Sequence, residues 1–263
     1  MPDTIRARRL LCATPLGTVH YLDVGAVDAP TVALLHQTPR SIDEFAEVVP
    51  RLARTHRVLA VDTPGYGCSD HPATPPTIAD YATSVLAVLD DAGCERAWVG
   101  GHHTGGVIAV ELAAARPARV QGVVFSGPVY TDAPMRAALS AHFGQWRVAA
   151  DGSHLREKWE KMLRWAGDPA LAQRVTVDLF RAGETSEFGH FAVAAYAMED
   201  RLPAVRCPGL LIYGRRDPFS TRAQAAPLAA AFTPASEIEL EGGIFLPNEV
   251  PGPWADAVAA FAR

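Results

Sequence analysis

The sequence lacks any apolar run long enough to cross a membrane, which would need about 20 consecutive apolar residues. Its amino-terminal stretch, residues 1–11, carries several arginines but only one apolar pair, Leu10 and Leu11. That pair is too short to form the core of a signal peptide. We therefore expect a cytoplasmic protein without a membrane partner.

Paired cysteines and clustered basic residues are also missing. The four cysteines lie far apart in the chain, at Cys12, Cys68, Cys94 and Cys207. Without a C-x-x-C pair or a secretion signal, we expect them to be reduced and structural. The formal net charge is -5 and the arginines are scattered. Nucleic acid is excluded as a partner, because phosphate binding needs a clustered basic surface.

The 263 residues present have an ordinary globular composition, with 49% hydrophobic and 20% charged residues. Short β-rich runs alternate with longer amphipathic ones, which predicts a mostly parallel sheet covered by helices on both faces. Strands are expected at 18–24, 31–35, 57–61, 96–100, 120–126, 209–213 and 237–240. Helices are expected at 42–54, 77–92, 105–115 and 253–262.

The alternation stops between residues 128 and 202, where the pattern is predominantly helical. We expect an α/β core made of 1–127 and 203–263, with 128–202 forming a helical lid over it. Leu155, Trp159, Met162 and Leu163 mark one helical face. Glu157 and Lys161 have the spacing of a favourable ion pair on a helix. The predicted lid is rich in aromatic residues, at Phe143, Trp146, Trp159, Trp165, Phe188 and Phe191, which indicates an apolar or aromatic small-molecule ligand.

A glycine-flanked turn follows the strand expected at 96–100. Gly101 and Gly105 enclose His102, His103 and Thr104. The spacing is that of the G-x-S-x-G nucleophile elbow, in which a sharp strand-to-helix turn lifts a serine hydroxyl above a sheet. The residue at the serine position is His103.

Five motifs in order resemble the α/β-hydrolase family over essentially the whole chain. They are Leu34-Leu35-His36-Gln37-Thr38-Pro39, Asp62-Thr63-Pro64-Gly65-Tyr66-Gly67-Cys68-Ser69-Asp70, the turn at 101–105, Tyr213-Gly214-Arg215-Arg216-Asp217-Pro218, and Gly242-Gly243-Ile244-Phe245-Leu246-Pro247. The resemblance implies the α/β-hydrolase fold, with a mostly parallel sheet and a helical lid insertion.

The same resemblance places the catalytic positions. The family's nucleophile falls on His103, its acid on Asp217 and its histidine base on Ile244. The oxyanion hole falls on the backbone N–H groups of Thr38 and Thr104. Two of the three triad residues therefore differ from the family pattern, and Gln37 replaces a glycine of the family's loop.

These replacements disfavour serine-type ester hydrolysis, because Ile244 cannot accept a proton and no hydroxyl stands at the apex. The longer side chain of His103 would fill the place of the missing base and hydrogen-bond Asp217. Such a pair could act as general acid and base without a cofactor. It suits proton abstraction next to a carbonyl, as in lyases, isomerases and cyclases. We expect a small substrate that carries a carbonyl group.

Other interpretations remain open. His36, Gln37 and His102 are expected beside the pocket with Ile244, although His36 and His102 usually have structural roles at these positions. His36, His102 and His103 lack recognised metal-ligand spacing, so no metal is expected. The chain could also be an inactive member of the fold that binds a small ligand. Alternatively, it could be a hydrolase in which another histidine activates water; His142, His154 and His190 lie in the predicted lid, and His190 is the example considered.

Overall fold

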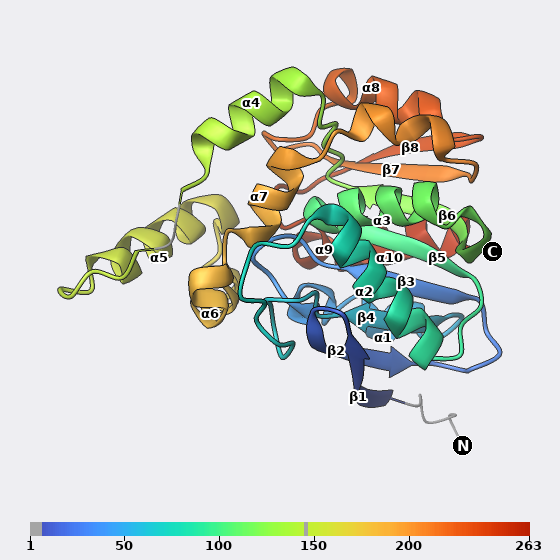
Figure 1. Ribbon diagram of the computed structural model, residues 1–263, viewed down its shortest axis with the longest axis horizontal. Coiled ribbons are helices and arrows are strands. Elements are labelled where there is room, and N and C mark those ends of the chain that lie inside the picture. Colours follow the sequence, from blue (N-terminus) through green and yellow to red (C-terminus); the bar gives the residue numbers. More distant parts are fainter. Residues whose placement is uncertain (1–6, 145–146) are drawn as a thin grey trace.

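The computed structural model describes residues 7–144 and 147–263. One eight-stranded sheet with the order β1-β2-β4-β3-β5-β6-β7-β8 crosses the molecule (Figure 1). The strand β2 runs antiparallel to both β1 and β4, and the remaining neighbours pair in parallel. The strands span Ala7–Thr14 (β1), Gly17–Val24 (β2), Thr31–Leu35 (β3), Arg57–Val61 (β4), Ala97–His102 (β5), Val120–Ser126 (β6), Gly209–Gly214 (β7) and Ala235–Leu240 (β8).

Helices cover both faces of the sheet, because the central strands bury side chains on each side. In β3, Ala33 and Leu35 face one hydrophobic cluster, whereas Val32 and Leu34 face the other. This is the two-sided burial expected of a parallel sheet. The first cluster includes residues of α2 (Ile78–Asp91), α3 (Thr104–Ala115) and α8 (Arg222–Ala231), and the second includes residues of α1 (Val49–Leu52), α9 (Leu246–Glu249) and α10 (Pro251–Phe261). The α/β-hydrolase fold predicted from the motifs is confirmed.

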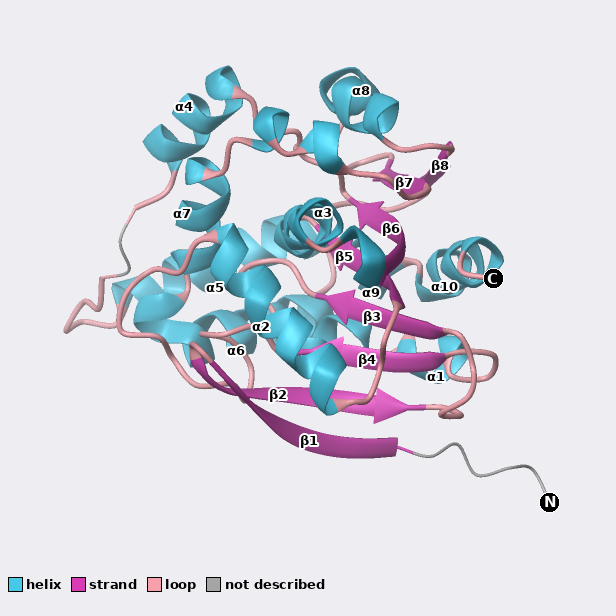
Figure 2. Cartoon of the chain, turned by 45° about the vertical axis from the view of Figure 1, so that its right-hand side comes forward, coloured by secondary structure: helices cyan, strands magenta, loops and turns pink. Residues whose placement is uncertain are grey.

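Between β6 and β7, residues 128–202 form what we call the helical insertion. Its α-helices are α4 (Ala133–His142), α5 (Ser153–Ala166), α6 (Pro169–Ala182) and α7 (Phe188–Ala195), and its short 3-10 helices span Gly183–Thr185 and Met198–Asp200. A further 3-10 helix, Leu202–Ala204, crosses its boundary with the core. Figure 2 shows α5 and α6 beyond the carboxyl ends of β3 and β4. Among the described residues, no helix has the length and hydropathy needed to cross a membrane.

Ionic contacts join the helical insertion to the core. Arg40 donates from Nε to Asp178 of α6 at 2.8 Å, and Ser41 donates to the same carboxylate at 2.8 Å. Arg174 of α6 donates to Asp43 at 2.8 Å. A small apolar cluster, which includes Phe245 of the core and residues of α5 and α6, fills the space between them. The insertion is therefore packed onto the loop that follows β8.

The structure differs from the sequence predictions in the helix at 42–54, in the strand β1 and in α8, where no helix is expected from the sequence and Pro227 lies inside the helix. The expected helix at 42–54 is split into a 3-10 helix, Ile42–Phe45, and α1. Pro50 lies in the first turn of α1 and has no N–H to continue a helix from the preceding turn. The strand β1 was not predicted, because its side chains are exposed or half-buried at seven of its eight positions and show little apolar alternation. The four cysteines are all free.

Candidate active site

The turn between β5 and α3 holds His103 in a strained backbone conformation. Its φ is 45° and its ψ is -110°, and it is the one non-glycine residue with positive φ in the described chain. The flanking glycines allow the close approach that this turn needs. A Cβ on Gly101 would lie 2.0 Å from the backbone of Gly105, and a Cβ on Gly105 would lie 2.0 Å from the carbonyl oxygen of Leu35. The sequence therefore folds here into a sharp strand-to-helix elbow that projects His103.

The His103 ring points to Asp217, which follows β7. Its Nε2 lies 3.0 Å from Asp217 Oδ2, an ion-pair distance, although the alignment required of a hydrogen bond is not met within the described chain. The ring lies against Gly127, where a Cβ would be only 2.8 Å from Nε2. Burial raises the pKa of Asp217, but the neighbouring His103 and the Phe219 N–H outweigh it and lower that pKa overall. Asp217 is therefore held as a carboxylate behind the imidazole.

His102 lies beneath the turn and does not line the cavity described below. Its Nε2 donates to the carbonyl oxygen of Ile244 at 2.9 Å, and its Nδ1 accepts from the Ser126 hydroxyl at 2.9 Å. Trp254 also donates to that hydroxyl, at 2.9 Å. Burial and the neighbouring His103 lower the pKa of His102 to about 3. A neutral His102 therefore ties the elbow to the loop that carries Ile244.

Gln37 makes a second connection to Ile244, by donating from Nε2 to its carbonyl oxygen at 3.1 Å. It also donates from its backbone and side-chain nitrogens to Glu44, each at 2.8 Å. Burial raises the pKa of Glu44. His36 lies outside the cavity lining; its Nδ1 donates to the Gln37 carbonyl at 2.8 Å and its Nε2 accepts from the Thr63 N–H at 3.0 Å. His36 therefore organises the loop.

The two positions expected to form an oxyanion hole lie on the cavity wall. Neither the Thr38 N–H nor the Thr104 N–H donates to another group in the described residues. Thr104 is the first residue of α3, so its N–H is one of those left unpaired at a helix start. Gly189 of α7 approaches Thr38 so closely that a Cβ there would lie 2.0 Å from its hydroxyl. Thr38 and Thr104 thus both line the cavity and carry backbone N–H groups without a partner among the described residues.

A cavity of about 560 Å³ lies between the core and the helical insertion. This volume is in the range of small-molecule sites, roughly 300–1,000 Å³. The predicted site residues that line it are Gln37, Thr38, His103, Thr104 and Ile244. Of the predicted lid aromatics, Phe143 and Trp165 line it, and Trp159, Phe188 and Phe191 do not. Trp146 falls outside the described residues, so its role stays a prediction.

The insertion contributes a second histidine–carboxylate pair to the same wall. His190 of α7 lies with Nδ1 2.7 Å from Glu187 Oε2, and its ring stacks on Phe143 with centroids 4.0 Å apart. Burial raises the pKa of Glu187, but His190 outweighs it and lowers that pKa overall, with help from nearby lysines. Glu187 was not singled out from the sequence. Its three-residue spacing from His190 across the start of a helix is the signal that could have found it.

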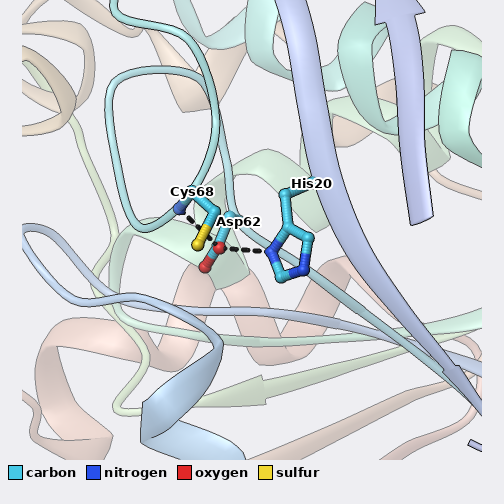
Figure 3. Close-up of side chains that lie close together, drawn as sticks. All are labelled: His20, Asp62 and Cys68. Carbon is cyan, nitrogen blue, oxygen red and sulfur yellow. Dashed lines mark hydrogen bonds and ion pairs between the residues drawn. The ribbon is translucent and has the colours of Figure 1, made fainter. Parts of the chain in front are cut away.

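Figure 3 shows another cluster, His20, Asp62 and Cys68, whose candidate metal-ligand atoms lie within 4.8 Å of one another. Asp62 Oδ2 accepts from His20 Nδ1 at 2.8 Å and from the Cys68 N–H at 2.9 Å. Its Oδ1 accepts from the Ile42 N–H at 2.7 Å, while Arg181 donates to the Cys68 sulfur at 3.1 Å. These hydrogen bonds account for the cluster as the support of the turn after β4.

Fold and site together define an α/β hydrolase-like core with a covered cavity. Residues 30–244 match a family model described as the alpha/beta hydrolase fold, and the chain belongs to this family. A haloalkane dehalogenase from Psychrobacter cryohalolentis is 38% identical over 104 residues, which are 38% of this chain and 34% of that protein. The acetyltransferase component of an acetoin cleaving system from Cupriavidus necator is 36% identical over 101 residues, 38% of this chain and 27% of that protein. The chain matches about a third of the length of these relatives.

Solved structures resemble the chain over nearly its full length. An enol-lactonase from Burkholderia xenovorans superposes with a TM-score of 0.78 at 25% identity, covering 96% of this chain and 99% of that one. Epoxide hydrolase A from Mycobacterium thermoresistibile gives a TM-score of 0.77 at 19% identity, covering 98% of each chain. The family consists mainly of enzymes.

Proposed function

We propose that the chain is a cofactor-independent enzyme that uses His103 and Asp217 for general acid/base chemistry on a small carbonyl compound. The single observation that supports this most is the 3.0 Å approach of His103 Nε2 to the Asp217 carboxylate, at the wall of a covered cavity. The proposed reaction class is proton transfer at the carbon next to a carbonyl, as in lyases, isomerases and cyclases.

The proposed mechanism starts with a neutral His103 whose Nε2–H faces Asp217. Its other nitrogen, Nδ1, has no hydrogen-bond partner among the described residues, so in this proposal it is the atom that meets the substrate. Nδ1 takes a proton from carbon, and Asp217 stabilises the imidazolium that forms. The N–H groups of Thr38 and Thr104 would hold the negative charge that develops on the carbonyl oxygen.

The side chain at position 244 supports this proposal over a serine-type one. Ile244 lines the cavity and offers no proton acceptor. A serine-type route would require both a hydroxyl at the elbow and a histidine to activate it. Here the elbow carries the imidazole itself.

Deuterium exchange in D2O tests the proposal without knowledge of the natural substrate. A panel of small ketones and keto acids with enolisable C–H groups would be followed by proton NMR. We expect the protein to accelerate exchange for at least one compound, and His103→Ala and Asp217→Asn to reduce that rate by about 10²–10⁴-fold. His154→Ala, a histidine of the insertion outside the cavity lining, is the matched control. Exchange that survives both substitutions would contradict the proposal.

A second candidate follows from the 2.7 Å His190–Glu187 pair. In that case His190 would activate a water molecule for hydrolysis, and His190→Ala would abolish turnover while His103→Ala would not. A third outcome, a ligand-induced rise in Tm with no exchange or hydrolysis, would favour an inactive member of the fold that binds a small ligand.

A further inference from the structure

Lysine is almost absent from this protein. Of 24 lysines and arginines, the two lysines are Lys158 and Lys161, three residues apart on α5. Both line the cavity. Residues three apart on a helix lie on the same face, so the two ammonium groups serve one wall. A chain that uses arginine for its other basic side chains therefore places both of its lysines at its binding cavity.

The charges that face this wall leave it positive. Glu187 is the one carboxylate residue among those that line the cavity in the described structure, and it is bonded to His190. The guanidinium of Arg40 also lines the cavity; its Nε and Nη1 donate to Asp178 and Asn248, and its Nη2 forms an ion pair with Asp43 at 3.6 Å. Among the cavity-lining residues of the described structure, the wall formed by the insertion therefore carries two lysines and one carboxylate.

Lys161 is in an environment that disfavours its charge. Burial lowers its pKa, and the neighbouring Lys158 lowers it further. Its ammonium lies 4.5 Å from the centroid of the Trp165 ring. It makes no ion pair with Glu157 in the described chain, so the pair expected from sequence spacing is not formed. An anion that entered the cavity would relieve this imbalance.

We propose that Lys158 and Lys161 bind the carboxylate of a small apolar acid, which is the substrate class of the site. This inference rests on the proposed function for the role of His103, but the binding it describes does not require turnover. The remaining wall suits an apolar body, since Val107, Leu139, Met162 and Leu179 line the same cavity. The methylene stems of the lysines cover apolar surface while the ammonium groups meet the anion.

Matched acid and amide probes test this proposal. Phenylacetate, 3-phenylpropionate and 4-phenylbutyrate would each be compared with the corresponding primary amide, by isothermal titration calorimetry at low salt. The measurements use wild type and His103→Ala, so that binding is read separately from catalysis. We expect at least one acid to bind tenfold or more tightly than its amide in both proteins.

Substitutions of the lysines identify the source of the preference. The double variant Lys158→Met and Lys161→Met keeps the apolar stems, and we expect it to lose the acid preference while its amide affinity changes less than twofold. The double arginine variant restores the charges and should retain a preference for the acid. Arg156→Met removes an exposed charge from the same helix outside the cavity lining and serves as the control.

Three results would overturn the proposal. They are equal affinity for acids and amides, an acid preference that survives loss of both lysines, and no binding of any of the three acids. Absence of exchange in the wild type, or exchange that survives His103→Ala, would overturn the catalytic role of His103, but with the acid preference intact it would leave the anion site standing.

Discussion

Two histidine–carboxylate pairs face one cavity, and they are built in different ways. The pair of the core, His103 and Asp217, joins residues 114 positions apart that the sheet brings to 3.0 Å. The pair of the insertion, His190 and Glu187, lies within three residues across the start of α7, at 2.7 Å. The side chains of the core pair are also less exposed, at 12% and 1%, against 24% and 13%. The sheet fixes the positions of His103 and Asp217 relative to the backbone N–H groups of Thr38 and Thr104. The positions of His190 and Glu187 depend on one helix, α7.

The core pair also has support that the pair of the insertion lacks. His103 stands on a strained turn, over Gly127, with His102 bonded beneath it. Backbone strain that the surroundings hold in place is typical of functional sites. The comparison therefore favours His103 and Asp217 as the reacting pair and leaves His190 and Glu187 a role in binding or proton supply.

The largest expected effect is a difference in exchange rate between the substitution of Asp217 and the substitution of Glu187. Asp217→Asn should reduce carbon-bound proton exchange by about 10²–10⁴-fold, because the imidazolium loses its partner charge. Glu187→Gln is expected to change the same rate less than tenfold. NMR-monitored exchange in D2O measures both. The opposite order would make the pair of the insertion the reacting one.

His102→Ala tests the support under the core pair. It leaves the Ser126 hydroxyl and the Ile244 carbonyl each with one hydrogen bond fewer. Unfolding free energy should fall by about 2 kcal/mol or more, because buried polar groups are left unsatisfied. Urea denaturation measures this, with His154→Ala in the insertion, which removes one hydrogen bond from the Ala149 N–H, expected to cost about 1 kcal/mol or less. Equal losses in the two variants would contradict the structural role of His102.

Gly127→Ala separates backbone strain from displacement of the His103 ring. Gly127 and Gly93 have nearly the same φ, +60° and +62°, but only Gly127 has the His103 ring beside its missing Cβ. Both alanine variants should lose about 1 kcal/mol of stability. Only Gly127→Ala should also lower the exchange rate, by about tenfold or more, since a misplaced catalytic group is costly. Similar exchange rates in the two variants would show that the ring position does not matter.

The smallest expected effect is a dependence of stability on pH. The folded-state pKa values of Asp217 and Glu187 are both lowered from the ordinary values of 3.8 and 4.5. The ionised forms therefore stabilise the fold above those ordinary values, and this contribution is lost as the pH falls through the lowered pKa values. Asp217→Asn and Glu187→Gln should be less stable than wild type at pH 7, with a gap that narrows in acid. Urea unfolding at pH 7 and near pH 3 checks this, and a gap that widens in acid would contradict it.

The core site could be predicted from sequence because motif spacing fixes it. Glycine is required at positions 101 and 105 because a Cβ there would collide with neighbouring backbone atoms. Asp217 follows β7, a strand whose register is set by burial on both faces. The helical insertion was less predictable. Met162 is buried as expected, but Leu155 of the same expected face is 45% exposed, because α5 packs on Phe245 and α6 rather than on the sheet. The direction in which the lysines point depends on that packing, which local periodicity does not encode.

The carbonyl of Ile244 accepts hydrogen bonds from His102 and from Gln37. The path of this loop is thus specified by a main-chain atom that every amino acid possesses. Neither hydrogen bond involves the side chain at 244, which packs against the apolar cluster that contains Met162 and Phe245. Position 244 is accordingly a natural target for redesign, where new chemical groups can be introduced into the cavity while the scaffold around the elbow keeps its shape.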